Sequence, residues 1–160
     1  MAEKTHIISA LVTNESGVLT RISGLFARRC FNIDSLVVCA TEDPEISRMT
    51  ISVRGDDNTL KQIILQLGKL PDCKQTLELD ANGAVLRELL LVKLAANATE
   101  RAQIQTVCTT YEAKIVDLSP ESMILELVGK PSKLDAFIEV LKPYKITELS
   151  RTGLTALNRK

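Results

Sequence analysis

Apolar residues follow two different spacings along the chain, and each change of spacing marks an element. Residues 6–12 form a β-branched apolar run that stops at the turn formers of residues 13–17, which predicts a strand followed by a loop. The next apolar positions are three to four residues apart, namely Val18, Leu19, Ile22, Leu25 and Phe26. That spacing predicts a helix ending near residue 30.

The rest of the first half continues in the same way. Residues 33–40 and 49–53 are predicted as strands joined by a turn through Glu42–Glu45, where proline and acidic residues favour a hairpin. A helix with its apolar stripe from Leu60 to Leu67 and a strand over residues 74–79 complete the segment. The order is βαββαβ, the ferredoxin-like pattern.

The second half repeats this order. Strands are expected at residues 88–95, 113–118, 123–128 and 145–150, and helices at 99–110 and 132–141. Met49–Gly55 resembles Met123–Gly129, and a helix follows each of them. Matching residues of the two segments and their helices are 74 positions apart throughout. We therefore predict an α+β protein of two tandem ferredoxin-like domains, residues 1–80 and 81–160.

Composition then narrows the partners. Apolar residues make up 45% of the 160 residues, enough for a core, and twenty basic residues balance twenty acidic ones. A neutral chain lacks the basic surface of a nucleic-acid or membrane-surface binder. No apolar run reaches the roughly 18 residues that span a bilayer, and the N-terminus lacks a signal or transit pattern. We expect neither nucleic acid nor membrane as a partner.

No set of residues predicts catalysis or metal binding. The four cysteines are far apart and His6 is the only histidine, so structural zinc is not expected and the cysteines read as small apolar fillers in a reducing compartment. His6 reads as a strand-edge residue, and Asp56–Asp57 as a helix cap. Aromatic residues are too few for RNA stacking. The first loop holds no thiolates that could carry a soft metal.

The loop Asn14–Leu19 carries the strongest functional signal. Its glycine allows close backbone approach, and the N–H groups that begin the next helix can hold a carboxylate. Asn32, before the next strand, could offer an amide oxygen to an ammonium. The pattern fits an amino-acid site. A second interpretation stays open, in which Asn14 or Ser16 caps the helix and Asn32 forms a turn.

Three ordered motifs give the chain a resemblance to a known family. Residues 14–19 (NESGVL), 31–38 (FNIDSLVV) and 47–51 (SRMTI) resemble the small regulatory subunit of acetohydroxyacid synthase, also called acetolactate synthase, and the likeness continues through residues 87–93, 133–137 and 150–153. It implies an N-terminal ACT domain, a C-terminal ferredoxin-like domain and no catalytic activity in this chain. The partner catalytic subunit is expected to use thiamine diphosphate, Mg²⁺ and FAD in branched-chain amino-acid synthesis, and this chain no cofactor.

The resemblance also implies feedback inhibition by valine, bound between the ACT domains of a homodimer. Carried over by position, Asn14, Gly17, Val18 and Leu19 form the loop side, and Asn32 and Ile33 come from the neighbour. Pairing of two sheets would cover the apolar strand 33–40, which lies at an edge in this topology. One departure is Cys30, where the family usually has a glycine that relaxes the helix end.

The contact with the catalytic subunit is expected at Ser47, Arg48 and Met49, whose other interpretation is strand solubility and core packing. The default expectation for the compartment is a bacterial cytoplasm, with a plastid or mitochondrion as the alternative if a transit peptide has been removed. A different function stays open: a free-standing ACT-type amino-acid sensor that acts on another enzyme or on a transcription factor.

Overall fold

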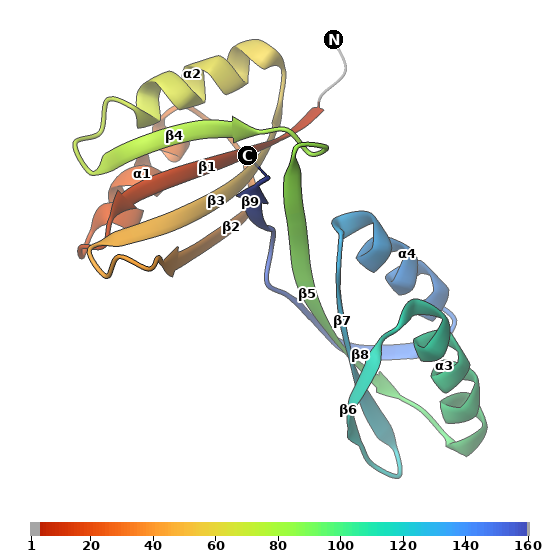
Figure 1. The fold of residues 1–160 in the computed structure, drawn as a ribbon. Helices are drawn as coiled ribbons and strands as arrows, with labels where there is room; N and C mark the ends of the chain where they lie inside the picture. Colours follow the sequence, from red (N-terminus) through yellow and green to blue (C-terminus); the bar gives the residue numbers. More distant parts are fainter. Residues whose placement is uncertain (1–3, 160) are drawn as a thin grey trace. The chain divides into compact units, whose positions relative to one another are not determined.

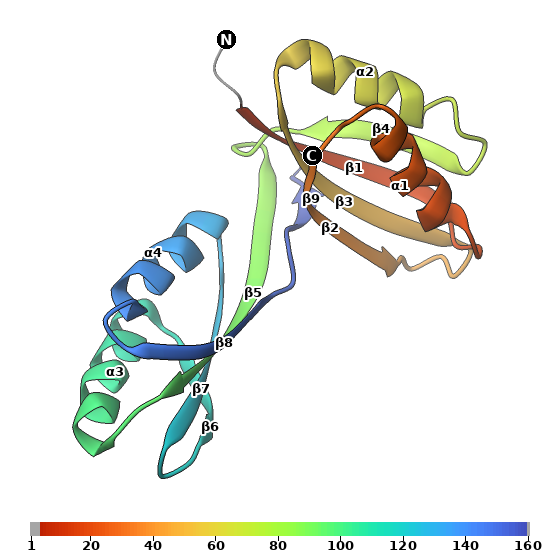
Figure 2. The same ribbon diagram turned by 180° about the vertical axis from the view of Figure 1, so that it is seen from behind.

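The computed structural model describes residues 4–159, and these residues form two compact units. The first unit contains the described chain up to Val85 and again from Leu154, and the second contains Leu86–Gly153. Each unit has a sheet with two helices packed on one face, as Figures 1 and 2 show. The α+β, ferredoxin-like prediction is confirmed for both halves.

The first unit has the predicted βαββαβ order. Its elements are β1 (Lys4–Thr13), α1 (Val18–Arg28), β2 (Ile33–Ala40), β3 (Ile46–Gly55), α2 (Asp57–Leu67) and β4 (Cys73–Leu79). The antiparallel sheet runs β2-β3-β1-β4, so β2 and β4 are its edges. Alternate residues of β1 and β3 face the helices, and the core consists of these and the helix stripes: Ile8, Ala10, Val12, Ile22, Phe26, Met49, Ile51, Ile63 and Leu67.

The second unit repeats the plan with β5 (Ala84–Ala95), α3 (Ala98–Tyr111), β6 (Lys114–Leu118), β7 (Ser122–Gly129), α4 (Pro131–Leu141) and β8 (Lys145–Arg151). The strand order is β6-β7-β5-β8. Strand β9 (Thr155–Asn158) also pairs with β5, whose first two residues, like β9, are grouped with the first unit. Its core is formed by alternate residues of β5 and β7 with the stripes of α3 and α4: Leu90, Val92, Leu94, Ile104, Met123, Leu125, Phe137 and Leu141.

The last described residues differ from the sequence expectation. The sequence pattern predicts that all residues after 80 belong to the second domain, whereas the segment from Leu154 groups with the first unit. Leu154 and Ala156 are buried, so this segment needs an apolar environment, and Arg159 N–H donates to Gly83 O at 3.0 Å. The first unit is therefore built from two separate stretches of the chain.

Both units end their first helix in the left-handed backbone region. Cys30 has φ 55° and Glu112 has φ 59°. The turn at Cys30 is closed by hydrogen bonds from Cys30 N to Ala27 O and from Phe31 N to Phe26 O. The ring of Phe31 then packs edge-on against Phe26, with centroids 6.3 Å apart. The residue in the expected glycine position thus adopts the conformation that glycine favours.

Candidate functional site

The loop between β1 and α1 is fastened to the β2–β3 hairpin by Asn14. Its backbone N–H donates to Glu45 O at 2.7 Å, and its side-chain Nδ2 donates to Pro44 O at 2.9 Å. Its Oδ1 accepts a hydrogen bond from Ser47 Oγ at 3.0 Å. Both polar groups of the Asn14 side chain are thereby used within the chain. Asn14 holds the loop in place at the end of the sheet where β2 finishes.

Helix α1 begins at Gly17 without a side-chain cap. Gly17 is in the left-handed region (φ 86°, ψ −12°), and neither Asn14 nor Ser16 caps the helix, contrary to the second interpretation of this loop. The backbone N–H groups of Leu19 and Thr20 have no acceptor among residues 4–159. A helix start of this kind presents orphan donors and the positive end of the helix dipole.

A cation stands beside this helix start. Arg21 donates through Nε and Nη2 to the two carboxylate oxygens of Asp72, at 2.7 and 2.9 Å. Its third nitrogen, Nη1, would lie 3.1 Å from a Cβ added at Gly17. The hydrogen bond from Arg21 lowers the pKa of Asp72, and the same bond raises the pKa of Arg21. Asp72 therefore stays ionised and anchors the guanidinium next to the loop.

These groups together suit a carboxylate. The two orphan N–H groups and Arg21 Nη1 offer hydrogen bonds and positive potential at a point that glycine leaves open to close approach. The two apolar residues of this loop that are expected in the site have different environments. Val18 is buried in the core, whereas 47% of Leu19 is exposed beside the helix start. Leu19 is the one that can contact an apolar ligand side chain.

The other half of the expected site lies at the opposite end of the sheet. Ile33 pairs with Val53 near the end of β3, whereas Ala40 pairs with Ser47 near its beginning. Asn32 is exposed and borders a hollow of about 910 Å³ between the α1–β2 and β3–α2 connections. Ile33 is half-buried and packs against the core.

The two halves are thus not brought together within one chain. Strand β2 spans eight residues between them, which at roughly 3.3 Å per residue puts Asn32 more than about 20 Å from the Asn14 loop. A site that uses both Asn32 and the loop needs two chains. The sequence assignment of Asn32 and Ile33 to a neighbour requires the same arrangement.

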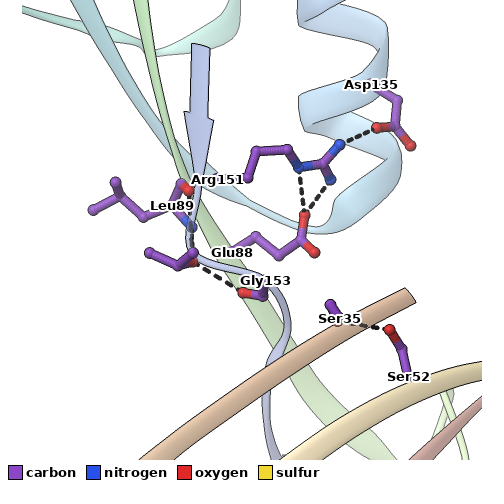
Figure 3. Close-up of polar contacts among 8 residues, drawn as sticks. Ser35, Ser52, Glu88, Leu89, Asp135, Arg151 and Gly153 are labelled. Atoms are coloured by element: carbon purple, nitrogen blue, oxygen red, sulfur yellow. Dashed lines mark hydrogen bonds and ion pairs between the residues drawn. The ribbon is translucent and has the colours of Figure 1, made fainter. Parts of the chain in front are cut away.

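Strand β2 is an open edge. Its residues are half-buried or exposed, and 41% of Val38 is exposed. The pairing with β3 shifts register between Ile33 and Ser35 and is regular from Ser35 to Ala40. Figure 3 shows Ser35 and Ser52, whose hydroxyl groups lie 2.6 Å apart across these two strands. A regular, partly apolar edge of this kind is suited to pairing with another strand.

The three residues expected to contact the catalytic subunit have different environments. Met49 is fully buried in the core, and Ser47 is 5% exposed and bonded to Asn14. Arg48 is half-buried, and its Nη1 donates to Ser9 Oγ at 3.1 Å. Met49 has no surface to offer, because it faces the helices, so only Arg48 presents a charged group.

The second unit has a different first loop. Asn97 caps α3 by accepting from Glu100 N at 3.0 Å, while Glu100 accepts from Asn97 N at 2.8 Å. This reciprocal pair is a capping box. It satisfies the backbone donor of Glu100, whose counterpart in α1, the N–H of Thr20, is free within the described chain. Elsewhere in this unit, Arg151 pairs with Glu88 and, at 2.6 Å, with Asp135 (Figure 3). That cluster joins β8 to β5 and α4.

The remaining candidate chemistry is structural. Within residues 4–159, no group of three or more His, Cys, Asp or Glu residues could hold a metal ion, and no described helix has the length and apolarity needed to cross a membrane. Asp56 caps α2, as expected. His6 is buried and lies 3.1 Å from Glu78 Oε1. The reading of all cysteines as apolar fillers is wrong for Cys30 and Cys39, which are exposed.

Sequence reasoning missed the Arg21–Asp72 pair. Arg21 comes one helical turn after Gly17, a spacing that brings a side chain back over the helix start. The position of Arg21 could therefore be predicted from the sequence. The pairing with Asp72 could not be predicted, because it depends on the α2–β4 connection returning to the end of β1, where Thr13 N donates to Asp72 O at 2.9 Å.

Comparisons with known proteins agree with this architecture. A family model described as an AHAS small subunit-like ACT domain matches residues 8–75, and one described as the small subunit of acetolactate synthase matches residues 87–160. The chain is 46% identical to a probable acetolactate synthase small subunit of Methanothermobacter thermautotrophicus, over 99% of this chain and 95% of that one. It is also 46% identical to the acetolactate synthase small subunit of Mycolicibacterium smegmatis, over 97% and 91%.

A solved structure gives the same result. The crystal structure of the acetolactate synthase small subunit from Thermotoga maritima superposes with a TM-score of 0.91 at 38% identity, and the match covers 98% of each chain. The likeness therefore extends through both units and both connecting segments.

Proposed function

Because the chain belongs to the family of acetolactate synthase small subunits, we propose that it activates a separate catalytic subunit and confers feedback inhibition by valine. In this proposal the catalytic subunit carries the reaction and its thiamine diphosphate, Mg²⁺ and FAD. This chain contributes an amino-acid site and a surface that transmits its occupancy.

One observation supports the proposal: the two groups of residues that we assign to the amino-acid site lie at opposite ends of the same edge strand. If two chains pair antiparallel along β2, the Ala40 end of one strand meets the Ile33 end of the other. The Asn14 loop of one chain then lies beside the Asn32 of its partner, and this occurs twice. The exposed edge and the split site thereby support the same homodimer.

Each site residue then has a role. The N–H groups of Leu19 and Thr20, with Arg21 Nη1, bind the ligand's carboxylate. The side-chain oxygen of the partner's Asn32 accepts a hydrogen bond from the ligand's ammonium group. Leu19 and the partner's Ile33 contact the branched side chain. Gly17 leaves room for the carboxylate, while Asn14 acts indirectly by holding the loop.

Valine binding across the seam would brace the two ACT domains against each other and change how they contact the catalytic subunit, with Arg48 as the expected charged contact. Such coupling amounts to about 1–3 kcal/mol and is reciprocal for binding. The bound catalytic subunit must therefore change the valine affinity of this chain, and an unchanged affinity would contradict the coupling.

The decisive test is the acetolactate synthase activity of a cognate catalytic subunit, measured with and without this protein and titrated with L-valine. We expect stimulation by the protein and a valine-dependent loss of that stimulated activity. Valine binding without any effect on the synthase would instead indicate a free-standing amino-acid sensor for another target. Turnover by this chain alone would contradict a regulatory role.

A further inference from the structure

The hairpin between β2 and β3 carries a cluster of acidic side chains. Glu42, Asp43 and Glu45 are all exposed, and none of them lies within 4.0 Å of a cationic group among residues 4–159. Asp43 Oδ1 accepts the backbone N–H of Glu45 at 2.9 Å, which fixes the shape of the turn. We call these three residues the acidic tip. It projects past the Ala40 end of β2, on the side of the Asn14 loop.

The opposite end of β2 carries uncompensated positive charge. Arg28 and Arg29 end helix α1, are exposed, and have no ion-pair partner in the described chain. We call them the basic pair. Arg29 also lines the hollow beside Asn32. The other charges there are already used, because Arg54 pairs with Asp34 at 3.0 Å and Asp56 caps α2.

Antiparallel pairing of β2 with β2 of a second copy brings these two charged groups to the same place. The acidic tip follows Ala40 by two to five residues, and the basic pair precedes Ile33 by four to five residues. Both therefore extend beyond the same end of the seam, one from each chain. The two-fold axis repeats the contact at the other end, so the surface is self-complementary.

We propose that the acidic tip of one chain docks on the basic pair of its partner and closes the amino-acid site at each end of the β2 seam. This contact rests on the proposed function, because it uses the same dimer. It adds a partner-supplied wall to the site: the tip that holds Asn14, through Pro44 and Glu45, is the tip that the partner's arginines bind. Effector binding and dimer contact are then joined through one hairpin.

Exposed charges at a rim mainly set orientation and association rate, and they are screened by salt. The contact therefore selects the antiparallel arrangement. A parallel pairing would place tip on tip and arginine on arginine.

Charge-reversed variants of the full chain test the contact directly. The basic-pair variant is Arg28→Glu with Arg29→Glu, and the acidic-tip variant is Glu42→Lys with Glu45→Lys. Each variant alone faces like charges at both ends of its dimer. We expect self-association, measured by sedimentation velocity, and L-valine affinity, measured by calorimetry, to weaken by about tenfold or more.

Mixing the two variants provides the sharper result. In a mixed dimer, the reversed glutamates of one chain face the reversed lysines of the other, and the native tip faces the native arginines. We expect a one-to-one mixture to recover dimerisation and L-valine binding, which a merely misfolded variant could not do. The matched control is Lys61→Glu with Lys69→Glu, two exposed lysines on and just after α2, which should leave both measurements at the wild-type level.

The outcomes distinguish a failure of the contact between the acidic tip and the basic pair from a failure of the proposed function. If the basic-pair variant dimerises and binds L-valine as tightly as the lysine control, or if mixing restores nothing, the contact is wrong while the proposed function stands. If the wild-type chain neither dimerises nor binds L-valine, the proposed function fails and the contact fails with it.

Discussion

The two units have the same fold, yet their first helices begin in opposite ways. Helix α3 starts with a capping box between Asn97 and Glu100, which satisfies the backbone N–H groups of these two residues internally. Helix α1 starts at Gly17 with no cap and with Arg21 alongside. A helix start can satisfy its donors with its own side chains or reserve them for a ligand. The first unit has the free helix start, and this difference supports the proposal of a ligand site there rather than in the second unit.

The edge strands differ in a parallel way. Strand β2 has eight residues and its bulge lies near its beginning, which leaves six residues in regular register. Strand β6 has five residues and its register shifts in the middle, around Val116. A short edge with a central bulge resists strand addition, whereas a long regular one permits it. The two units thus share one fold and differ in the edge strand and in the loop before the first helix.

The largest effect should come from a lysine on the pairing edge. Val38→Lys puts two lysines into a two-fold seam, and we expect the dimer to weaken by about 100-fold, or about 3 kcal/mol, with loss of the valine response. The matched change on the other edge, Val116→Lys, should leave association unchanged. Sedimentation velocity over a concentration series measures both. Equal effects of the two lysines would remove the distinction between the edges.

The next effect concerns the helix starts. Gly17→Asp forces a side chain into the left-handed region at a cost of about 1–2 kcal/mol, and its carboxylate competes for the donors that the ligand needs. We expect valine affinity to fall by at least about tenfold and feedback to be released while activation of the catalytic subunit persists. Calorimetry and the synthase assay measure the two.

The matched change in the second unit is Asn97→Ala, which removes a cap. It should lower the free energy of unfolding by about 1 kcal/mol and leave valine affinity unaltered. Loss of valine binding in Asn97→Ala would show that the second loop also takes part in the site.

The smallest effect concerns a feature that both units share. Cys30 and Glu112 are non-glycine residues with positive φ, so Cys30→Gly and Glu112→Gly should each stabilise the protein by about 0.5–1 kcal/mol. Glu112 should gain less, because glycine removes its exposed ion pair with Lys133. Urea unfolding measures the difference. Destabilisation by Cys30→Gly would indicate that the thiol makes a contact of its own.

Much of the fold could be predicted because periodicity and turn chemistry agree along the chain. The apolar stripe of α1 and the alternation in β1 and β3 each point to one face, and the structure buries those faces. The short β9 was missed because four residues after a glycine carry too little pattern to mark a strand.

The candidate site could be predicted less completely. Gly17 and its loop could be recognised from the sequence, because the conformation of a glycine at a helix start depends on the residues next to it in the chain. The bonding of Asn14 to the hairpin and the pairing of Arg21 with Asp72 depend on residues more than twenty positions away. The burial of Met49 followed from the alternation of β3, yet a motif resemblance drew attention to it as a surface residue.

The grouping of β9 with the first unit has a consequence for the synthesis of the chain on the ribosome. A ribosome makes the first eighty-five residues early, but the buried Leu154 and Ala156 that complete the unit emerge only after the entire second unit. The first unit is therefore finished last, although it is begun first. Deletion of residues 154–159 would therefore remove buried side chains from the N-terminal unit, while the second unit, Leu86–Gly153, would keep all of its residues.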